Sequence, residues 1–520
     1  MNENMPPTLT LATASVLIAT FFIFILYRII FHPLRSFPGP WLNATTELPS
    51  ALKLAKGQQH TYYHRLHQKY GPVLRTAPNE LTFTSDQAWN DVYGLKNGVV
   101  LEKSPIFIGI VSPMNGCVGV GLAKGKEHTR QRRALAPGLS KTALYKQEEI
   151  IQRHVSALLD LLRKNVEQDE PSNIAEYFSF TTFDAIGDLS FSEPFGCLKQ
   201  NKTTEWASAM RQVVIFASYD QAIRRVAGVD TWLRNLLLKV CMPAKAAHWR
   251  MLHVKKSLEK TAQRLEKPDS EKQDMIYHLL REKDPKKSLN HDEIKLNMML
   301  YISAGSETTS ITLTAWAYLI GTHSEAYRQL TTEIRSSISS SADIKVDTVM
   351  SLPYLGATIN EAMRLFPPGA VAMQRMVPPG GVTIDGHYVP GGTTVSVAPW
   401  AASRSPDNFH EPDSFRPERW LQTLNQYQDK AFANDRLGAS RPFGYGPKRC
   451  IGEDLSYLEA RLIISHLLFT FDMELVDGHS PGAEANLRWG LRSDSESIQL
   501  YQVLMKPDLW VRLTKRTDVG

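Results

Sequence analysis

One cysteine in a glycine-rich loop most strongly limits what this chain can fold into. The loop, residues 443–452, reads Phe-Gly-Tyr-Gly-Pro-Lys-Arg-Cys-Ile-Gly, and apolar residues repeat at helical spacing just beyond it, from Leu455 to Ile463. Cys450 therefore precedes a helix, whose partial positive charge and unpaired N–H groups lower a thiol pKa and favour the metal-binding thiolate. Gly446 and Gly452 let the backbone lie close to a flat ligand. The alternative is a buried free cysteine beside a turn.

The N-terminal segment predicts a membrane anchor. Every residue from Leu9 to Tyr27 is apolar or small and none is charged, which is close to the ~20 residues of a membrane-spanning helix. Arg28 and Arg35 follow the apolar run, so the rest of the chain is expected on the cytoplasmic side. A cleaved signal peptide is the alternative, but no Lys or Arg precedes the run and the run exceeds a usual signal core.

We therefore divide the chain into three parts. Residues 1–31 are the expected anchor. Residues 32–44 are a proline-rich hinge, because Pro33, Pro38, Gly39 and Pro40 break the helix. Residues 45–520 are expected to form one folded domain, since neither a repeat nor a low-complexity linker interrupts them.

The charge balance and the cysteine spacing argue against several classes of protein. With 59 Lys and Arg against 53 Asp and Glu, the basic excess is too small to indicate nucleic-acid binding. The cysteines lie far apart with no paired spacing, which argues against a zinc site or a disulfide framework and for a reducing compartment. They are Cys117, Cys197, Cys241 and Cys450.

Hydrophobic periodicity predicts a mainly α domain with small sheets at its side. Helical spacing dominates from about Gln59 to Phe366. Val73–Phe83 is typical of a short hairpin, and Val382–Val397 of a second β-rich patch with an Asp-Gly turn. A third patch is expected near Leu500–Leu513.

The longest helix is expected over Asn290–His323, because Asn290 or Asp292 can cap its start and no proline interrupts it. About thirty residues at 1.5 Å each span roughly 45 Å, so this helix crosses the core. Small and polar residues interrupt it at Ala304-Gly-Ser-Glu-Thr-Thr309. There a flat ligand could lie against Ala304, with Glu307 and Thr308 beside it. Alternatively, the threonine bonds back to the preceding turn and the glutamate forms a salt bridge elsewhere.

Two further motifs carry opposite charges. Glu361 and Arg364 share one helix face at i and i+3, and Pro367 ends that helix. Arg419 lies in the later segment Phe415–Trp420. A buried glutamate between the two arginines would form a bidentate network that locks the segment leading to Cys450. A surface ion pair is the ordinary alternative.

The order of these four motifs resembles the cytochrome P450 family over nearly the whole chain, anchor included. The resemblance implies a mainly α cytochrome P450 fold, preceded here by one transmembrane helix, with heme b (iron protoporphyrin IX) held between the long helix and the cysteine loop. It assigns Cys450 as the axial thiolate, a ligand that favours O–O cleavage. Glu307 and Thr308 would serve oxygen activation, and Ala304, Phe443 and Gly452 would contact the haem. It also implies the structural ion network of Glu361, Arg364 and Arg419.

The same resemblance implies cations for the haem propionates. His128 and Arg132 match the family's propionate-binding helix, with histidine where tryptophan is usual. Arg375 is similar to a second propionate contact. Lys448 replaces the family's usual arginine, so it keeps a donor but loses the planar fork.

We accordingly expect residues 45–520 to be a haem-thiolate monooxygenase in the endoplasmic reticulum membrane, with its catalytic domain facing the cytosol. Its electrons would come from NADPH through a separate reductase, docked on basic residues such as Lys124, Lys126, Arg130, Arg133 and Arg449. The alternatives are a haem-thiolate isomerase or dehydratase that uses neither O₂ nor reductase, and a non-catalytic haem-binding protein.

The substrate is expected to be a hydrophobic small molecule, because the segments that form the pocket wall in the family are mainly apolar here. These include Ile106, Phe107, Ile108, Val371 and Met373. The segment Phe183–Cys197 resembles filamentous-fungal members of the family, many of which act in secondary metabolism. That likeness does not identify the substrate.

Overall fold

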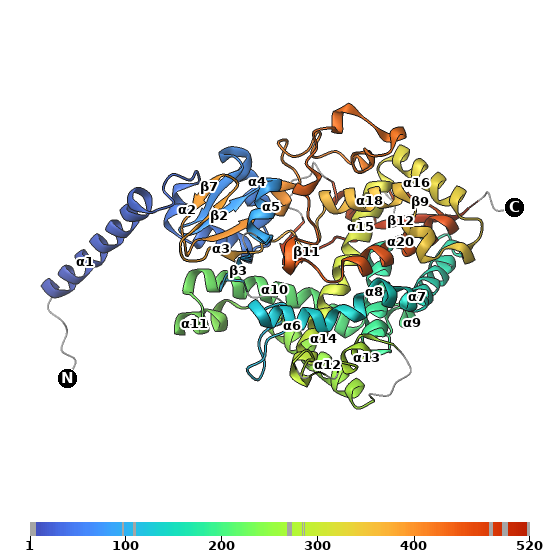
Figure 1. Ribbon diagram of the computed structural model, residues 1–520, viewed down its shortest axis with the longest axis horizontal. Coiled ribbons are helices and arrows are strands. Elements are labelled where there is room, and N and C mark those ends of the chain that lie inside the picture. Colours follow the sequence, from blue (N-terminus) through green and yellow to red (C-terminus); the bar gives the residue numbers. More distant parts are fainter. Residues whose placement is uncertain are drawn as a thin grey trace.

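A computed structural model shows the arrangement of the chain in space (Figure 1). The structure describes residues 7–95, 98–107, 111–267, 273–282, 284, 286–477, 482–490 and 498–516.

The described residues form a large helical body with a smaller β-rich part beside it, from which helix α1 projects (Figure 1). The predicted mainly α fold with small sheets is confirmed. The helices at the N-terminal side are α1 (Pro7–Leu26), α2 (Trp41–Thr45), α3 (Leu48–Ala55), α4 (Gln59–Tyr70) and α5 (Asp86–Tyr93). Those of the body are α6 (Gly125–Leu135), α7 (Lys141–Glu167), α8 (Ile174–Phe191), α9 (Cys197–Gln200), α10 (Glu205–Ala227), α11 (Trp232–Cys241), α12 (Ala244–Leu265), α13 (Met275–Leu280), α14 (His291–Gly305), α15 (Glu307–Gly321), α16 (Ser324–Ser337), α17 (Val346–Met350), α18 (Pro353–Leu365), α19 (Pro399–Ala402), α20 (Glu453–Thr470) and α21 (Ala483–Leu487).

The three predicted β-rich patches form strands, and they pair across long stretches of sequence. A five-stranded sheet has the order β1-β2-β8-β5-β3. Its strands are β1 (Val73–Ala77), β2 (Glu80–Phe83), β8 (Thr394–Val397), β5 (Arg375–Met376) and β3 (Glu102–Lys103). The others are β4 (Ser172–Asn173), β6 (Val382–Ile384), β7 (His387–Val389), β9 (Phe471–Leu475), β10 (Leu500–Tyr501), β11 (Val503–Leu504) and β12 (Trp510–Lys515). The predicted turn at Asp385 joins β6 to β7, with a positive φ of 48°.

The long central helix begins as expected but is broken in its middle. Asn290 caps α14, and Glu293 completes a capping box. The prediction of one unbroken helix over Asn290–His323 is wrong, because α14 ends at Gly305 and α15 starts at Glu307. The hydroxyl of Ser306 donates to the Ile302 carbonyl at 2.9 Å. Hydroxyl groups that bond back to the preceding turn bend a helix, and several occur here in succession.

The break lies next to a close contact between the long helix and α8. A Cβ atom on Gly305 would come within 2.8 Å of the Ile186 side chain on α8, so this helix packs closely at that point. Beyond the break, Leu313, Trp316 and Ile320 of α15 are fully buried. The long helix therefore forms the centre of the core, as its apolar sequence predicts.

The segment predicted as a hinge packs against the body. Leu34 is fully buried, and the carbonyl of Pro38 accepts a hydrogen bond from the Arg75 N–H of β1 at 2.8 Å. Residues 41–44 of the predicted hinge belong to α2. Searched over the described residues, the structure has no helix that combines the length and the apolar character needed to cross a membrane.

Candidate active site

The cysteine loop is a rigid turn that leads into α20. The Cys450 N–H donates to the Phe443 carbonyl at 2.8 Å, which closes the loop. Gly444 and Gly446 have positive φ angles of 73° and 74°. A Cβ on Gly446 would lie 2.1 Å from the Tyr93 carbonyl oxygen, so glycine is required by the packing of the protein itself. The loop thus holds the sulfur at the start of α20, as the sequence predicts.

The Cys450 side chain faces a cavity of about 410 Å³ between the cysteine loop and the long helix. Most of the predicted site residues line it: Ala304, Thr308, His128, Arg132, Phe443, Lys448, Cys450 and Gly452. Two predicted residues, Glu307 and Arg375, do not belong to the wall that the described residues form. Residues far apart in sequence therefore meet at one cavity, with a thiol on one side and the bent helix on the other.

The thiol of Cys450 has a higher pKa than the sequence led us to expect. Burial raises the pKa, while the Gly452 N–H, Arg132 and Arg449 lower it by smaller amounts. In the protein alone the pKa of this thiol is therefore raised by desolvation, whereas the sequence predicted a lowered pKa at the helix N-terminus. A cation bonded to the sulfur supplies the missing stabilisation, since metal coordination deprotonates a thiol.

Several cations gather at one end of the cavity. Burial, followed by repulsion from Arg375 and Lys448, lowers the pKa of the Lys103 ammonium to about 7. Burial and the charges of Lys103 and Lys448 lower the pKa of His128 to about 4. Arg132 donates to the Arg449 carbonyl at 2.7 Å and lines the same wall. Lys448 pairs with the Glu102 carboxylate, and the remaining positive charge of the cluster favours further anions in the cavity.

Lys103 is a member of this cluster that sequence reasoning missed. It lies on β3 directly opposite Arg375 on β5, so the strand register brings the two cations together. Arg375 is buried behind the wall, where its guanidinium donates to the carbonyls of Met373 and Gln374 and lies over the Tyr93 ring. Its Nε has no partner among the residues that the structure describes. Lys103 could be placed in this cluster only from the pairing of β3 with β5. A strand of two residues is too short to be predicted from the sequence.

These features fit an iron porphyrin. Cys450 offers the soft sulfur ligand that such iron takes in one class of haem protein. The cation cluster suits the two carboxylates at the edge of the porphyrin. Gly452 has φ −90°, which any residue adopts, and a Cβ there would meet only the Cys450 sulfur at 3.9 Å. Glycine therefore keeps space open beside the sulfur, where a flat ring needs it.

The polar pair on the long helix is divided between two cavities. Thr308 lines the main cavity and donates to the Ala304 carbonyl at 2.6 Å, as the alternative reading of this motif predicts. Glu307 faces a smaller cavity of about 170 Å³, where its carboxylate pairs with the Lys506 ammonium at 3.2 Å. Lys506 also donates to Ser310. The Glu307 side chain therefore lies on the side of the helix away from the main cavity, where it forms an ion pair with a buried lysine.

Two further titratable groups on the main cavity were also missed. Burial raises the pKa of the Glu459 carboxyl to about 8, and a hydrogen bond with Thr309 lowers it by less. The Oε1 atom of Glu459 and the hydroxyl of Tyr301 are buried without a partner in the described part of the chain. Glu459 lies on α20 and Tyr301 on α14, and both residues line the cavity. No sequence motif singled out either residue.

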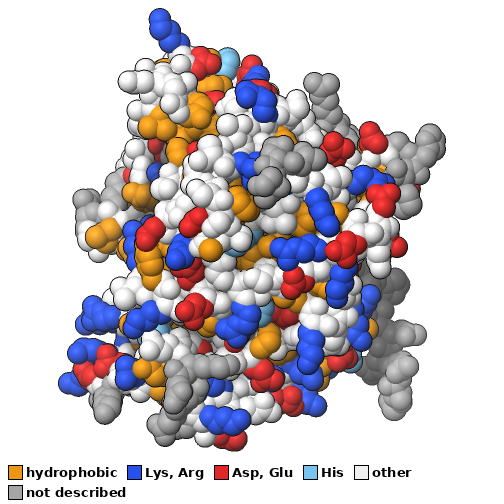
Figure 2. Space-filling model, turned by 90° about the vertical axis from the view of Figure 1, so that its right-hand side faces the viewer, with side chains coloured by type: hydrophobic (Ala, Val, Ile, Leu, Met, Phe, Trp, Pro, Cys, Tyr) orange, Lys and Arg blue, Asp and Glu red, His pale blue; other side chains and the backbone are white. Residues whose placement is uncertain are grey.

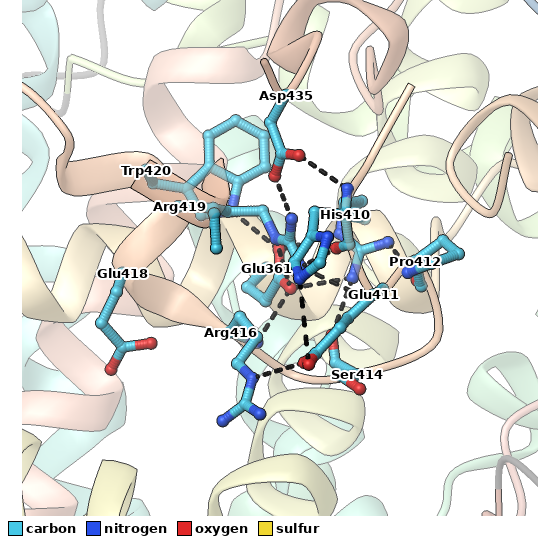
Figure 3. Close-up of polar contacts among 12 residues, drawn as sticks. Glu361, His410, Glu411, Pro412, Ser414, Arg416, Glu418, Arg419, Trp420 and Asp435 are labelled. Atoms are coloured by element: carbon cyan, nitrogen blue, oxygen red, sulfur yellow. Dashed lines mark hydrogen bonds and ion pairs between the residues drawn. The ribbon is translucent and has the colours of Figure 1, made fainter. Parts of the chain in front are cut away.

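The ion network predicted around Glu361 is present and fully buried (Figure 3). Glu361 accepts from Arg364 at 2.8 Å and from Arg419 at 3.0 Å. The indole N–H of Trp420 also donates to it at 2.9 Å. Asp435, which the sequence did not single out, pairs with Arg419. The arginines also donate to carbonyls of the intervening loop, including those of Ser403, His410 and Ser414.

The apolar wall is partly as predicted. Phe107, Val371 and Met373 line the main cavity, whereas Ile106 does not belong to its described wall. Ile108 lies outside the described residues. Leu300, Ile186 and other apolar side chains of α14 and α8 complete this side. The cavity therefore has an apolar region, a cationic end and a single thiol.

Comparison with known proteins agrees with this site. A family model described as Cytochrome P450 matches residues 38–500. The chain is 50% identical over 490 residues to cytochrome P450 monooxygenase aba2 of Botryotinia fuckeliana, covering 94% of this chain and 92% of that protein. It is 47% identical over 506 residues to cytochrome P450 monooxygenase ABA2 of Pyricularia oryzae, with 97% and 96% covered. It is 35% identical over 494 residues to averantin hydroxylase of Dothistroma septosporum, with 95% and 89% covered.

Proposed function

The chain belongs to the cytochrome P450 family, and from that premise we propose that it is a monooxygenase that oxidises a hydrophobic small molecule of fungal secondary metabolism. The observation that carries the proposal is Cys450 facing a cavity that also holds Thr308 and the cation cluster. The relatives with half of their residues identical are named monooxygenases, and one relative is named a hydroxylase. Those names favour oxidation over the isomerase, dehydratase and carrier functions.

The chain's own residues would hold the haem as follows. Cys450 would bind the iron through its sulfur, and Lys103, Arg132 and Lys448 would bind the porphyrin carboxylates, with His128 beside them. Arg375 lies behind Lys103, and its charge helps to lower the pKa of that ammonium. When bound, the haem supplies the activation of O₂ and the oxidation of a C–H bond. Ala304 presents a small side chain on the opposite side of the cavity, where the substrate would lie against the long helix.

Thr308 and Glu307 are proposed to transfer protons to the cavity. In the structure the Thr308 hydroxyl directs its proton to the Ala304 carbonyl. Turning about its Cα–Cβ bond directs that proton into the cavity instead. Glu307 would pass a proton on the far side of the helix, where its carboxylate pairs with the Lys506 ammonium, the group of the pair that carries the proton. Protons then reach the cavity along the break between α14 and α15, where backbone bonding is already incomplete.

Electrons are proposed to come from NADPH through a separate reductase. The surface beside α6 and the cysteine loop carries exposed Lys124, Lys126, Arg133 and Arg449. Arg130 is half-buried and pairs with Glu127 and Glu293, so we assign it to holding α6 rather than to docking. An acidic partner surface fits the exposed cations, which would speed encounter at low salt.

We also propose that residues 1–31 anchor the protein in the endoplasmic reticulum membrane with the body in the cytosol. Phe21, Phe22 and Ile23 of α1 are exposed. Trp232, Leu236 and Val240 are exposed on α11, which lies on the same side of the molecule (Figure 1). The face turned away from α1 instead mixes Lys and Arg with Asp and Glu, with hydrophobic side chains in small groups (Figure 2). Apolar exposure near α1 suits a lipid surface.

The test is oxygen incorporation. The haem-loaded protein is mixed with a NADPH-dependent reductase, NADPH, labelled O₂ and extracts or intermediates of fungal secondary metabolism. The proposal expects NADPH consumption that depends on the substrate and a product carrying one labelled oxygen atom. A product formed without NADPH or without label would instead identify an isomerase or dehydratase. Haem binding without turnover of any substrate would favour a carrier.

A further inference from the structure

Three buried glutamines form a hydrogen-bonded chain that starts at the wall of the main cavity. The Gln502 side-chain nitrogen donates to the Gln221 oxygen at 2.8 Å, and the Gln221 nitrogen donates to the Gln374 oxygen at 3.1 Å. Gln502 lies between β10 and β11, Gln221 on α10 and Gln374 just before β5. All three are buried, and Gln502 lines the cavity. The chain therefore leads from the cavity wall into the protein interior.

This chain has hydrogen-bonding capacity left at both ends. The Gln374 side-chain nitrogen is buried and has no partner among the described residues. The side-chain hydrogen bonds that Gln502 forms within the described part of the chain are donated by its nitrogen, which leaves its oxygen as an acceptor. Turning all three amides by 180° exchanges donors for acceptors along the chain. Gln502 can therefore offer either an acceptor or a donor to a molecule in the cavity.

The backbone at Gln502 shows that the turn alone does not require this residue. Gln502 has φ +62° at the tip of the hairpin, between Tyr501 and Val503, which pair with each other. This left-handed region favours glycine, and a longer side chain adopts it at a conformational cost. The hairpin instead carries a long amide whose nitrogen is fixed by Gln221 and, at 3.4 Å, by Ser218. A strained position with a fixed polar side chain on a cavity wall is typical of a binding site.

The surroundings define what such a site would bind. Phe107, Leu300, Val371 and Met373 line the same cavity with apolar surface. We propose that Gln502, supported by Gln221 and Gln374, hydrogen-bonds one oxygen group of an otherwise apolar substrate, so that the substrate class is a hydrocarbon skeleton carrying a hydroxyl, carbonyl or carboxyl group. This inference rests on the proposed function, because it concerns the substrate cavity of the same monooxygenase. It makes Gln502 a specificity-determining residue.

The experiment compares four probes of one skeleton: decalin, 2-decalol, 2-decalone and decalin-2-carboxylic acid. Dissociation constants are measured for the haem-loaded enzyme by the change in haem absorbance and, independently, by equilibrium dialysis. One buried hydrogen bond contributes about a tenfold gain in affinity. We therefore expect at least one oxygenated probe to bind about tenfold more tightly than decalin. Which of the three it is distinguishes the alcohol, the ketone and the acid.

The variants separate recognition from folding. Gln502→Leu removes the amide, and Gln221→Leu breaks the chain behind it; both should reduce the preference to within about twofold while decalin binds as before. Gln502→Gly serves as a second variant, because it removes the amide and also relaxes the turn. Gln499→Leu is the matched control, since Gln499 is exposed and lies on the same hairpin segment. The control should keep the full preference.

The inference is overturned if the wild-type enzyme binds decalin as tightly as every oxygenated probe. It is also overturned if Gln502→Leu and Gln502→Gly keep the wild-type preference. Dialysis reports probe binding without any turnover, so these results do not depend on monooxygenase activity. A protein that binds an oxygenated probe more tightly than decalin but incorporates no labelled oxygen would refute the proposed function. The role of Gln502 in binding an oxygen group of the ligand would still be supported.

Discussion

Replacing Glu361 by glutamine tests whether the buried ion network holds the segment that leads to Cys450. Glu361, Arg364 and Arg419 have fully buried side chains, and Asp435 is the other carboxylate that pairs with Arg419. Glutamine has nearly the same shape, but it removes the charge and turns an NH₂ group toward arginine donors. Breaking a buried pair by removing one partner costs about 3–5 kcal/mol. That is a large part of the ~5–15 kcal/mol that stabilises a folded domain.

The assay is chemical unfolding of the haem-loaded enzyme, followed by tryptophan fluorescence and by haem absorbance. Glu361→Gln should lower the free energy of unfolding by about 3–5 kcal/mol in both signals. Glu361→Asp keeps the charge and should lose less. Glu411→Gln is the control, because Glu411 pairs with Arg416 at 3.0 Å on the exposed side of the same loop. A Glu361→Gln variant as stable as that control would refute the reasoning.

Other consequences can be measured on the same protein. Thr308→Ala should bind haem and substrate normally but release electrons as hydrogen peroxide, so that product per NADPH falls at least about tenfold; full coupling would contradict the role given to its hydroxyl. Lys506→Met should slow turnover with little change in substrate affinity, because Glu307 loses its partner, and an unchanged rate would exclude this path for protons. His253 has its pKa lowered to about 3 by burial, and its Nδ1 accepts from the Trp206 indole at 3.1 Å. The unfolded chain therefore binds one more proton below its ordinary pKa of 6.5, and stability falls by about 2 kcal/mol between pH 7.5 and pH 5. His253→Gln should remove that part of the pH dependence in urea titrations, and an equal slope in both proteins would count against it.

Much of the fold and of the candidate site can be predicted from local sequence patterns. The cysteine loop, the helix after it and the charged pair on α18 all depend on neighbours within a few residues, so spacing predicts them. The β-rich patches were recognised because turn residues and alternation are also local signals. The cap at Asn290 follows from the same kind of pattern.

What the sequence did not predict depends on contacts between distant segments. Lys506 reaches Glu307 across 199 residues, and no local pattern records that approach. Lys103 meets Arg375 only through a strand register, and Gln502 meets Gln221 only where a hairpin packs on α10. The direction of the Cys450 pKa shift differs from the prediction because desolvation of the sulfur, which the sequence does not reveal, raises this pKa. The break at Ser306 likewise comes from side chains that compete for the backbone.

The most direct test is whether iron in the purified protein is bonded to the sulfur of Cys450. X-ray absorption at the iron edge should show one sulfur neighbour in the wild-type protein and in Cys197→Ser, but none in Cys450→Ser. Iron without a sulfur neighbour in the wild-type protein, or with one in Cys450→Ser, would contradict the account of this site.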